Sequence, residues 1–112
     1  MGHYIYIASP YSHPEDAVRE QRYYDVVDYT ARCLNAGEFV FSPIAQNHTI
    51  ALHHKMPTTW DFWSKIDYAM VDGAHTVRVL MLDGWDKSVG VAAEVEYAKA
   101  NGKNVEYAEW TK

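Results

Sequence analysis

The chain has 112 residues, a net charge of −5 and no block of basic residues. This composition argues against binding to a nucleic-acid polymer, which needs a stripe of Lys and Arg, but not against a single nucleoside or nucleotide. The length fits one domain over residues 1–112, and the single Cys33 excludes an internal disulfide and fits a reducing cytoplasm. Cys33 lies beside Leu34 in a helical pattern, which favours a buried structural thiol. We expect neither a signal peptide nor a membrane-spanning segment.

The first part of the chain predicts a strand, a long helix and a second strand. Tyr4–Ala8 is a β-branched and aromatic run that is typical of a strand. Ser12 followed by Glu15 matches a capping box, so a helix is expected over His13–Asn35. The short apolar run Phe39–Ser42 predicts the second strand.

The remaining chain begins with Ile44–Pro57, which is rich in His and is predicted to be irregular. A helix is expected over Thr58–Asp72, and the nearly continuous apolar run Thr76–Asp83 predicts a third strand. A turn with the sequence GWDKSVG then leads into a helix that contains Glu94. The last strand is expected at Asn104–Ala108.

This alternation of short apolar strands with helices predicts a parallel sheet that is covered on both faces. The expected architecture is an α/β, flavodoxin- or Rossmann-like three-layer sandwich with four or five strands. Such sheets bind ligands beyond the carboxyl ends of their strands. The loops that begin at Ala8, Ser42 and Asp83 would meet there.

Two glutamates in the last helix, Glu94 and Glu96, lie two positions apart and therefore face different sides. Glu96 falls near Lys99 and Lys103 on a solvated face, whereas Glu94 lies about 60° from the centre of the apolar stripe. Glu94 could simply stabilise the start of its own helix, where the backbone dipole keeps a carboxylate ionised. Because that start lies at the ligand-binding edge, we expect Glu94 to point into the crevice.

The histidines invite a metal hypothesis, but their spacing matches no zinc pattern and there is no second cysteine. We therefore expect no metal and no cofactor, and we interpret the segment with His48, His53 and His54 as a loop over the pocket. Asp67 lies in mid-helix beside Trp63 and Ile66. It either caps a local group or faces a polar crevice, where burial would raise its pKa.

Three segments together resemble the nucleoside 2-deoxyribosyltransferase superfamily and its related 2'-deoxynucleoside 5'-monophosphate N-glycosidases. They are YIYIASPYS at the start, KIDYAMVDGAHTVRVLM around Asp67, and SVGVAAE, which contains Glu94. The segments IYIASPYSHP and FSPI look most like a small branch of bacterial and phage proteins labelled DUF1937. One departure concerns the first loop, SPYSHP, which lacks the Gly and Arg of the glycosidases.

The resemblance implies roles for individual residues. Glu94 matches the nucleophile that attacks the sugar C1', Asp67 the carboxylate that assists the leaving base, and Tyr6 the residue that orients the nucleophile. Ser88 matches a serine that binds the 5'-phosphate. The other candidate substrate-binding residues are Ser9, Gly90, Asp83 and Trp63.

The expected function is cleavage or transfer at the N-glycosidic bond of a 2'-deoxynucleoside or its 5'-monophosphate. Hydrolase and transferase differ only in what attacks the intermediate, so the sequence leaves both open. Two alternatives remain: a nucleotide-binding module without turnover, and an enzyme acting on NAD-like ribosyl compounds. Four Trp and nine Tyr are more aromatic surface than a small core hides, which predicts a homo-oligomer, most simply a dimer.

Overall fold

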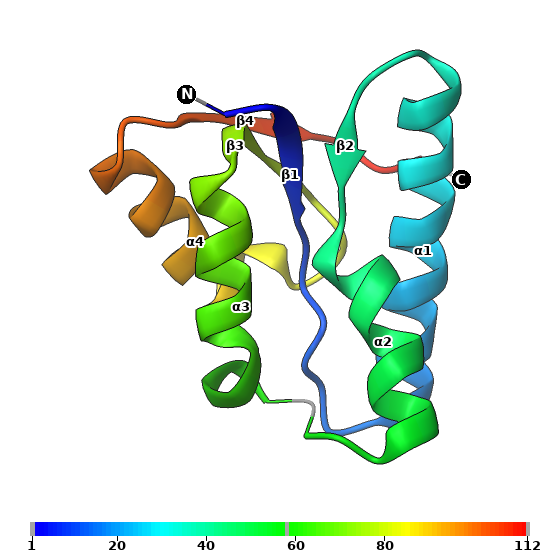
Figure 1. Ribbon diagram of the computed structural model, residues 1–112. Helices are drawn as coiled ribbons and strands as arrows, with labels where there is room; N and C mark the ends of the chain where they lie inside the picture. Colours follow the sequence, from blue (N-terminus) through cyan, green and yellow to red (C-terminus); the bar gives the residue numbers. More distant parts are fainter. Residues whose placement is uncertain (1, 58, 112) are drawn as a thin grey trace.

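The computed structural model describes residues 2–57 and 59–111 and contains a four-stranded, fully parallel sheet (Figure 1). The strand order is β2-β1-β3-β4, so β1 and β3 lie at the centre. The strands are β1 (Tyr4–Ala8), β2 (Val40–Phe41), β3 (Ala74–Leu80) and β4 (Asn104–Ala108).

Helices cover both faces of this sheet. In Figure 1, helices lie on either side of the sheet, which makes three layers and confirms the predicted architecture. They are α1 (Asp16–Asn35) with α2 (Pro43–His54), and α3 (Trp60–Asp72) with α4 (Val89–Ala100); a short 3-10 turn, η1 (Trp85–Lys87), precedes α4. No helix in the described ranges combines the length and apolar character needed to cross a membrane.

Successive side chains of β1 point to opposite faces of the sheet and belong to two separate hydrophobic clusters. Tyr6 and Ala8 pack with Val71 of α3 and Val91 of α4, whereas Ile7 packs on the other face in a cluster that includes Val26 of α1. The Tyr6 ring therefore points toward α3 and α4 and is completely buried there.

The expectation of irregular structure at Ile44–Pro57 is wrong, because α2 occupies most of this segment. Ser42 caps the helix by accepting a hydrogen bond from the Ala45 N–H at 3.1 Å, and Pro43 occupies the first turn, where proline is well suited. The Ser-Pro pair, interpreted from the sequence as the end of a strand, is the start of a helix.

Element boundaries also differ from the predictions: β2 is Val40–Phe41 rather than Phe39–Ser42, and α3 begins at Trp60, while its predicted start, Thr58, lies outside the described residues. The first helix begins at Asp16 rather than His13. Its N-cap residue is Glu15, whose side chain makes no capping hydrogen bond, and the Glu15 N–H bonds to His13 Nδ1 at 3.0 Å. The third strand is Ala74–Leu80 rather than Thr76–Asp83, because the chain turns after it: the Leu82 N–H bonds to the Leu80 carbonyl.

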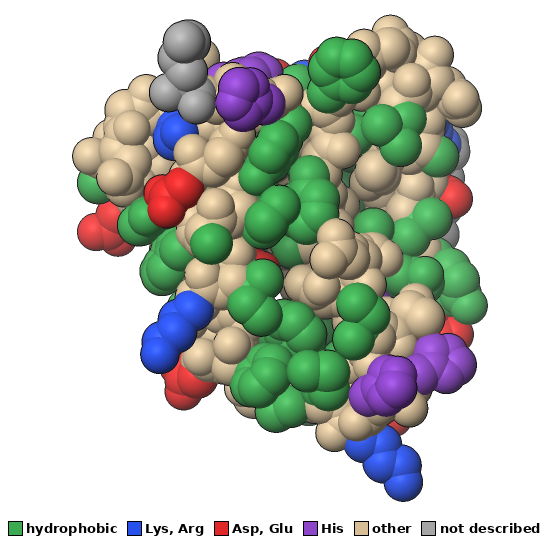
Figure 2. Space-filling view, viewed as in Figure 1, with side chains coloured by type: hydrophobic (Ala, Val, Ile, Leu, Met, Phe, Trp, Pro, Cys, Tyr) green, Lys and Arg blue, Asp and Glu red, His purple; other side chains and the backbone are tan. Residues whose placement is uncertain are grey.

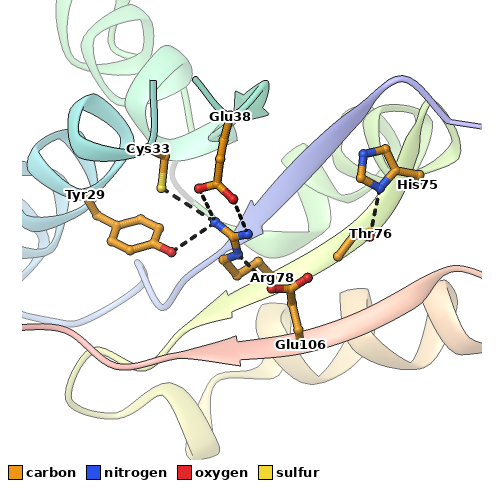
Figure 3. Close-up of polar contacts among 7 residues, drawn as sticks. All are labelled: Tyr29, Cys33, Glu38, His75, Thr76, Arg78 and Glu106. Carbon is orange, nitrogen blue, oxygen red and sulfur yellow. Dashed lines mark hydrogen bonds and ion pairs between the residues drawn. The ribbon is translucent and has the colours of Figure 1, made fainter. Parts of the chain in front are cut away.

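A buried arginine on β3 ties three elements together (Figure 3). Arg78 donates to both carboxylate oxygens of Glu38, at 2.9 and 2.7 Å, and to Glu106 Oε2 on β4 at 3.1 Å. It also donates to the Tyr29 hydroxyl at 3.3 Å and to Cys33 Sγ at 3.7 Å, both on α1. Cys33 is buried, as expected for a structural thiol.

Candidate functional site

A cavity of about 530 Å3 opens at the carboxyl edge of the sheet, with α2 and α3 on either side (Figure 1). Its volume is typical of a small-molecule site. The segments that follow β1, β2 and β3 all contribute to its walls, although after β2 the wall is formed by the helix α2 rather than by the expected loop. Because β1 separates β2 from β3, this place is also where the strand order changes direction, the usual ligand site of such sheets.

Glu94 and Asp67 line this cavity, and Tyr6 lies behind them. Glu94 is 4% exposed, although it belongs to a helix that faces solvent on its other side, where Glu96 is exposed as predicted. The Tyr6 hydroxyl donates a hydrogen bond to Glu94 Oε2. Asp67 approaches from α3 and interacts with both Tyr6 and Glu94.

The two carboxyls are electrostatically coupled. Burial, and then the charge of Asp67, raise the pKa of Glu94 well above its usual range. Burial also raises the pKa of Asp67 to about 6, as the sequence predicted. Glu94 lies beyond the first turn of α4, where the helix dipole has little effect, so the expectation of a dipole-stabilised carboxylate left out burial, which raises the pKa.

Ser88 and Gly90 lie where α4 begins. Ser88 lines the cavity and caps the helix by accepting a hydrogen bond from the Val91 N–H at 3.2 Å. A Cβ at Gly90 would lie 3.3 Å from Cε3 of Trp60, so the missing side chain leaves room for this ring against α4. Gly90 thus shapes the cavity wall through Trp60, which also lines it.

Of the other predicted substrate-binding residues, two line the cavity and one does not. Ser9 and Trp63 line the cavity, and the Trp63 indole N–H donates to the Pro57 carbonyl at 2.7 Å, which fixes the ring. Asp83 does not line it. Asp83 is exposed, and its carbonyl accepts a hydrogen bond from Arg22 at 3.2 Å.

Comparison with known proteins places this arrangement in a family. The model of a domain of unknown function, DUF1937, matches residues 3–110. The chain belongs to the DUF1937 family. A search of curated proteins found no match. The family match covers every strand and helix described above and therefore every residue of the candidate site.

One wall of the DUF1937 site is supplied by α2, where the sequence predicted that the segment with His48 would lie over the pocket as a loop. His48 stacks on Tyr23, with ring centroids 4.2 Å apart, and its Nδ1 lies 2.6 Å from the Tyr11 hydroxyl. Burial lowers the pKa of His48. Ile44, Asn47, His48 and Ala51 all line the cavity, and their spacing is that of one helical face. That spacing would have revealed the wall if the segment had been interpreted as a helix.

The DUF1937 site has no evident place for a metal ion. Within residues 2–57 and 59–111, no three His, Cys, Asp or Glu side chains are grouped so that they could hold one. His48, the histidine that lines the cavity, is held by two tyrosines.

The raised pKa of Asp67 predicts how stability depends on pH. The folded protein holds the Asp67 proton more tightly than the unfolded chain does, so this carboxyl lowers stability as pH rises from about 4 to about 6. Asp67→Asn removes the titration. The free energy of unfolding of the variant, relative to that of wild type, should therefore increase by up to about 3 kcal/mol when the pH is raised from 3.5 to 7.5. Urea unfolding at the two pH values measures this, and a difference that does not change with pH would contradict it.

Proposed function

We propose that this DUF1937 protein breaks or transfers the N-glycosidic bond of a 2'-deoxynucleoside or its 5'-monophosphate, with Glu94 as the nucleophile. One observation carries the proposal. A buried glutamate, held by the hydroxyl of a buried tyrosine and coupled to a second carboxyl, lines a cavity of nucleoside size. The sequence likeness of the segments around Tyr6, Asp67 and Glu94 to deoxyribosyltransferases supports the same function.

The chemistry requires a carboxylate against the anomeric carbon. As the bond from C1' to the base nitrogen breaks, positive charge develops on the sugar ring, and Glu94 stabilises it and then captures C1' as an ester. The bonding electrons leave with the base, which takes up a proton from solvent. Water, or the nitrogen of a second base, then attacks C1' and breaks the ester bond, which regenerates the Glu94 carboxylate, returns a proton to solvent and releases the free sugar or a new nucleoside.

Glu94 must be ionised to attack, and its surroundings allow this when substrate binds. The coupled pair shares protons, so Glu94 and Asp67 titrate together rather than separately. Hydrogen bonding from Tyr6 favours the charged form of Glu94. The positive charge that develops at C1' favours it further, which directs the shared proton toward Asp67.

The rest of the cavity suits the other parts of a nucleoside. Trp60 and Trp63 give the wall on α3 two aromatic rings, whose apolar faces suit the nonpolar parts of a nucleoside. Lys87 and Ser88 line the cavity at the start of α4, where a cation and the positive end of the helix dipole suit the 5'-hydroxyl or 5'-phosphate.

A base-release screen tests the proposal. Purified protein is incubated with the four common 2'-deoxynucleosides, their 5'-monophosphates and the matching ribonucleosides, each with and without a second free base. Chromatography is expected to show release of free base, or exchange for the second base, from the deoxy compounds. Binding of these compounds without release or exchange would contradict catalysis and favour a nucleotide-binding module.

We also propose that the protein is a homodimer. Figure 2 shows hydrophobic side chains gathered at the lower end of α3 and upward between α3 and α2. Large apolar side chains of these two helices are exposed: Ile50, Leu52, Phe62 and Ile66. Exposed apolar surface of this kind is typical of an interface.

Light scattering coupled to size exclusion is expected to give about twice the chain mass of 12.9 kDa. The double variant Phe62→Lys/Ile66→Lys should give the monomer mass. Phe39→Lys is the matched control, since Phe39 is equally apolar and more exposed than Phe62 and Ile66 but precedes β2 at the opposite edge of the sheet. A monomeric wild type would contradict the dimer.

A further inference from the structure

Two buried polar atoms on the cavity wall have no hydrogen-bond partner among the described residues. They are Asp67 Oδ1 and Ser9 Oγ, and the two side chains are 8% and 7% exposed. Buried polar groups are almost always paired in native proteins. These two atoms therefore mark positions where a ligand in the cavity supplies a polar group. A carboxylate oxygen such as Asp67 Oδ1 accepts, so it needs a donor from that ligand.

Asp67 lies on the same side of the cavity as Glu94. The two residues come from the neighbouring helices α3 and α4, both line the cavity, and the Tyr6 side chain interacts with both. A ligand whose reacting carbon lies against Glu94 therefore presents to Asp67 the same face that it presents to the nucleophile.

Stereochemistry decides which groups lie on that face. A nucleophile attacks C1' from the face opposite the leaving group. In a β-nucleoside the base projects from one face of the sugar, and the hydroxyls at C2' and C3' project from the other. The face that meets Glu94 thus carries the sugar hydroxyls, and the base lies on the far side.

We propose that Asp67 accepts a hydrogen bond through Oδ1 from the sugar hydroxyl at C3' or C2', and so holds C1' against Glu94. This assignment rests on the proposed function and differs from the role that the sequence resemblance implies, assistance to the leaving base. The departing base instead meets the opposite wall. There, the Tyr11 hydroxyl and His48 offer a neutral donor and acceptor pair on α2 and the first loop.

Binding of sugar variants to an inactive background tests this contact. Isothermal titration calorimetry is performed on Glu94→Gln, Glu94→Gln/Asp67→Ala and Glu94→Gln/Asp67→Asn proteins, each checked for folding by circular dichroism. The ligands are adenosine, 2'-deoxyadenosine, 3'-deoxyadenosine and 2',3'-dideoxyadenosine, with the matching uracil series. Asp67→Ala should weaken binding by about 10- to 100-fold for sugars that carry the recognised hydroxyl. The same substitution should weaken binding of the dideoxy compounds by less than about 3-fold. Asp67→Asn keeps an acceptor oxygen, so its loss of affinity for the hydroxyl-bearing sugars should be smaller than that of Asp67→Ala.

An equal loss for all four sugars, or no binding of any, would overturn the assignment. Turnover provides a second criterion, with kcat/KM compared between wild type and Asp67→Ala on 2'-deoxyguanosine and on its N7-methylated form, whose base leaves without protonation. A loss that vanishes on the methylated substrate would make Asp67 the acid, and the proposal would fall while the proposed function stood. Hydroxyl-dependent binding without base release from wild type would support the contact and contradict the proposed function.

Discussion

Replacing Glu94 with glutamine is expected to lower base release or transfer by at least about 1,000-fold, since loss of a covalent nucleophile commonly costs several orders of magnitude. The amide has nearly the same shape as the carboxyl and still accepts from the Tyr6 hydroxyl, so the fold should be intact. It cannot form the ester with C1', and it does not stabilise positive charge on the sugar. Release of free base under single-turnover conditions measures the loss.

Glu96→Gln is the matched control. Glu96 belongs to the same helix and loses the same charge, but it is exposed and lies away from the cavity. Its activity should stay within about 2-fold of wild type, as for most surface substitutions. Similar losses in both variants would point to a general effect on α4, and retained activity in Glu94→Gln would remove Glu94 as the nucleophile.

Much of the fold could be predicted from the sequence because each central strand is buried on both faces. Such strands give the continuous apolar runs YIYIA and TVRVL, and the helices between them impose parallel pairing. The histidine-rich composition of the segment after Pro43 hides the helix α2, which only the spacing of its cavity-lining residues reveals. The strand order, with β1 between β2 and β3, depends on long-range pairing that no local pattern reports.

The candidate site was predictable in position but not in electrostatics. Helical phase put Glu94 at the margin of the buried face of α4, and the expected start of this helix at the ligand-binding edge of the sheet directed it toward the crevice. Its protonation depends on Tyr6, which is 88 positions away in the chain, and on Asp67, which lies in another helix. The sequence correctly predicted that Asp83 lies at the carboxyl edge of the sheet, but its side chain does not reach the cavity, since the chain turns at Gly84.

The partners of Arg78 likewise come from distant parts of the chain, and replacing this residue is expected to destabilise the protein. The sequence TVRVL places one charge inside an apolar strand, with no local sign of its partners. They come from β4, from α1 and from Glu38, which precedes β2, and the arginine is 9% exposed (Figure 3). The guanidinium in turn holds the pKa of Glu38 below its usual range.

Arg78→Met is expected to lower the free energy of unfolding by about 2–3 kcal/mol and the melting temperature by roughly 10 °C. Loss of one partner of a buried ion pair usually costs about 3–5 kcal/mol, but the side chains of Glu38 and Glu106 are 37% and 51% exposed and regain water. Arg78→Lys keeps the charge without the fork that meets both oxygens of Glu38, so its loss should be intermediate.

The pH dependence separates this electrostatic cause from lost packing. Because the pKa of Glu38 is lowered in the folded protein, its ion pair with Arg78 stabilises the fold above the ordinary pKa of the carboxyl and is lost as pH falls through the lowered value. The difference between wild type and Arg78→Met should therefore shrink between pH 6 and pH 3. Lys99→Met, an exposed change on α4 that removes the same charge, should cost less than about 0.5 kcal/mol at either pH. If the Arg78→Met deficit persists unchanged at pH 3, the arginine stabilises the sheet through its aliphatic stem, and the carboxylates around it contribute little.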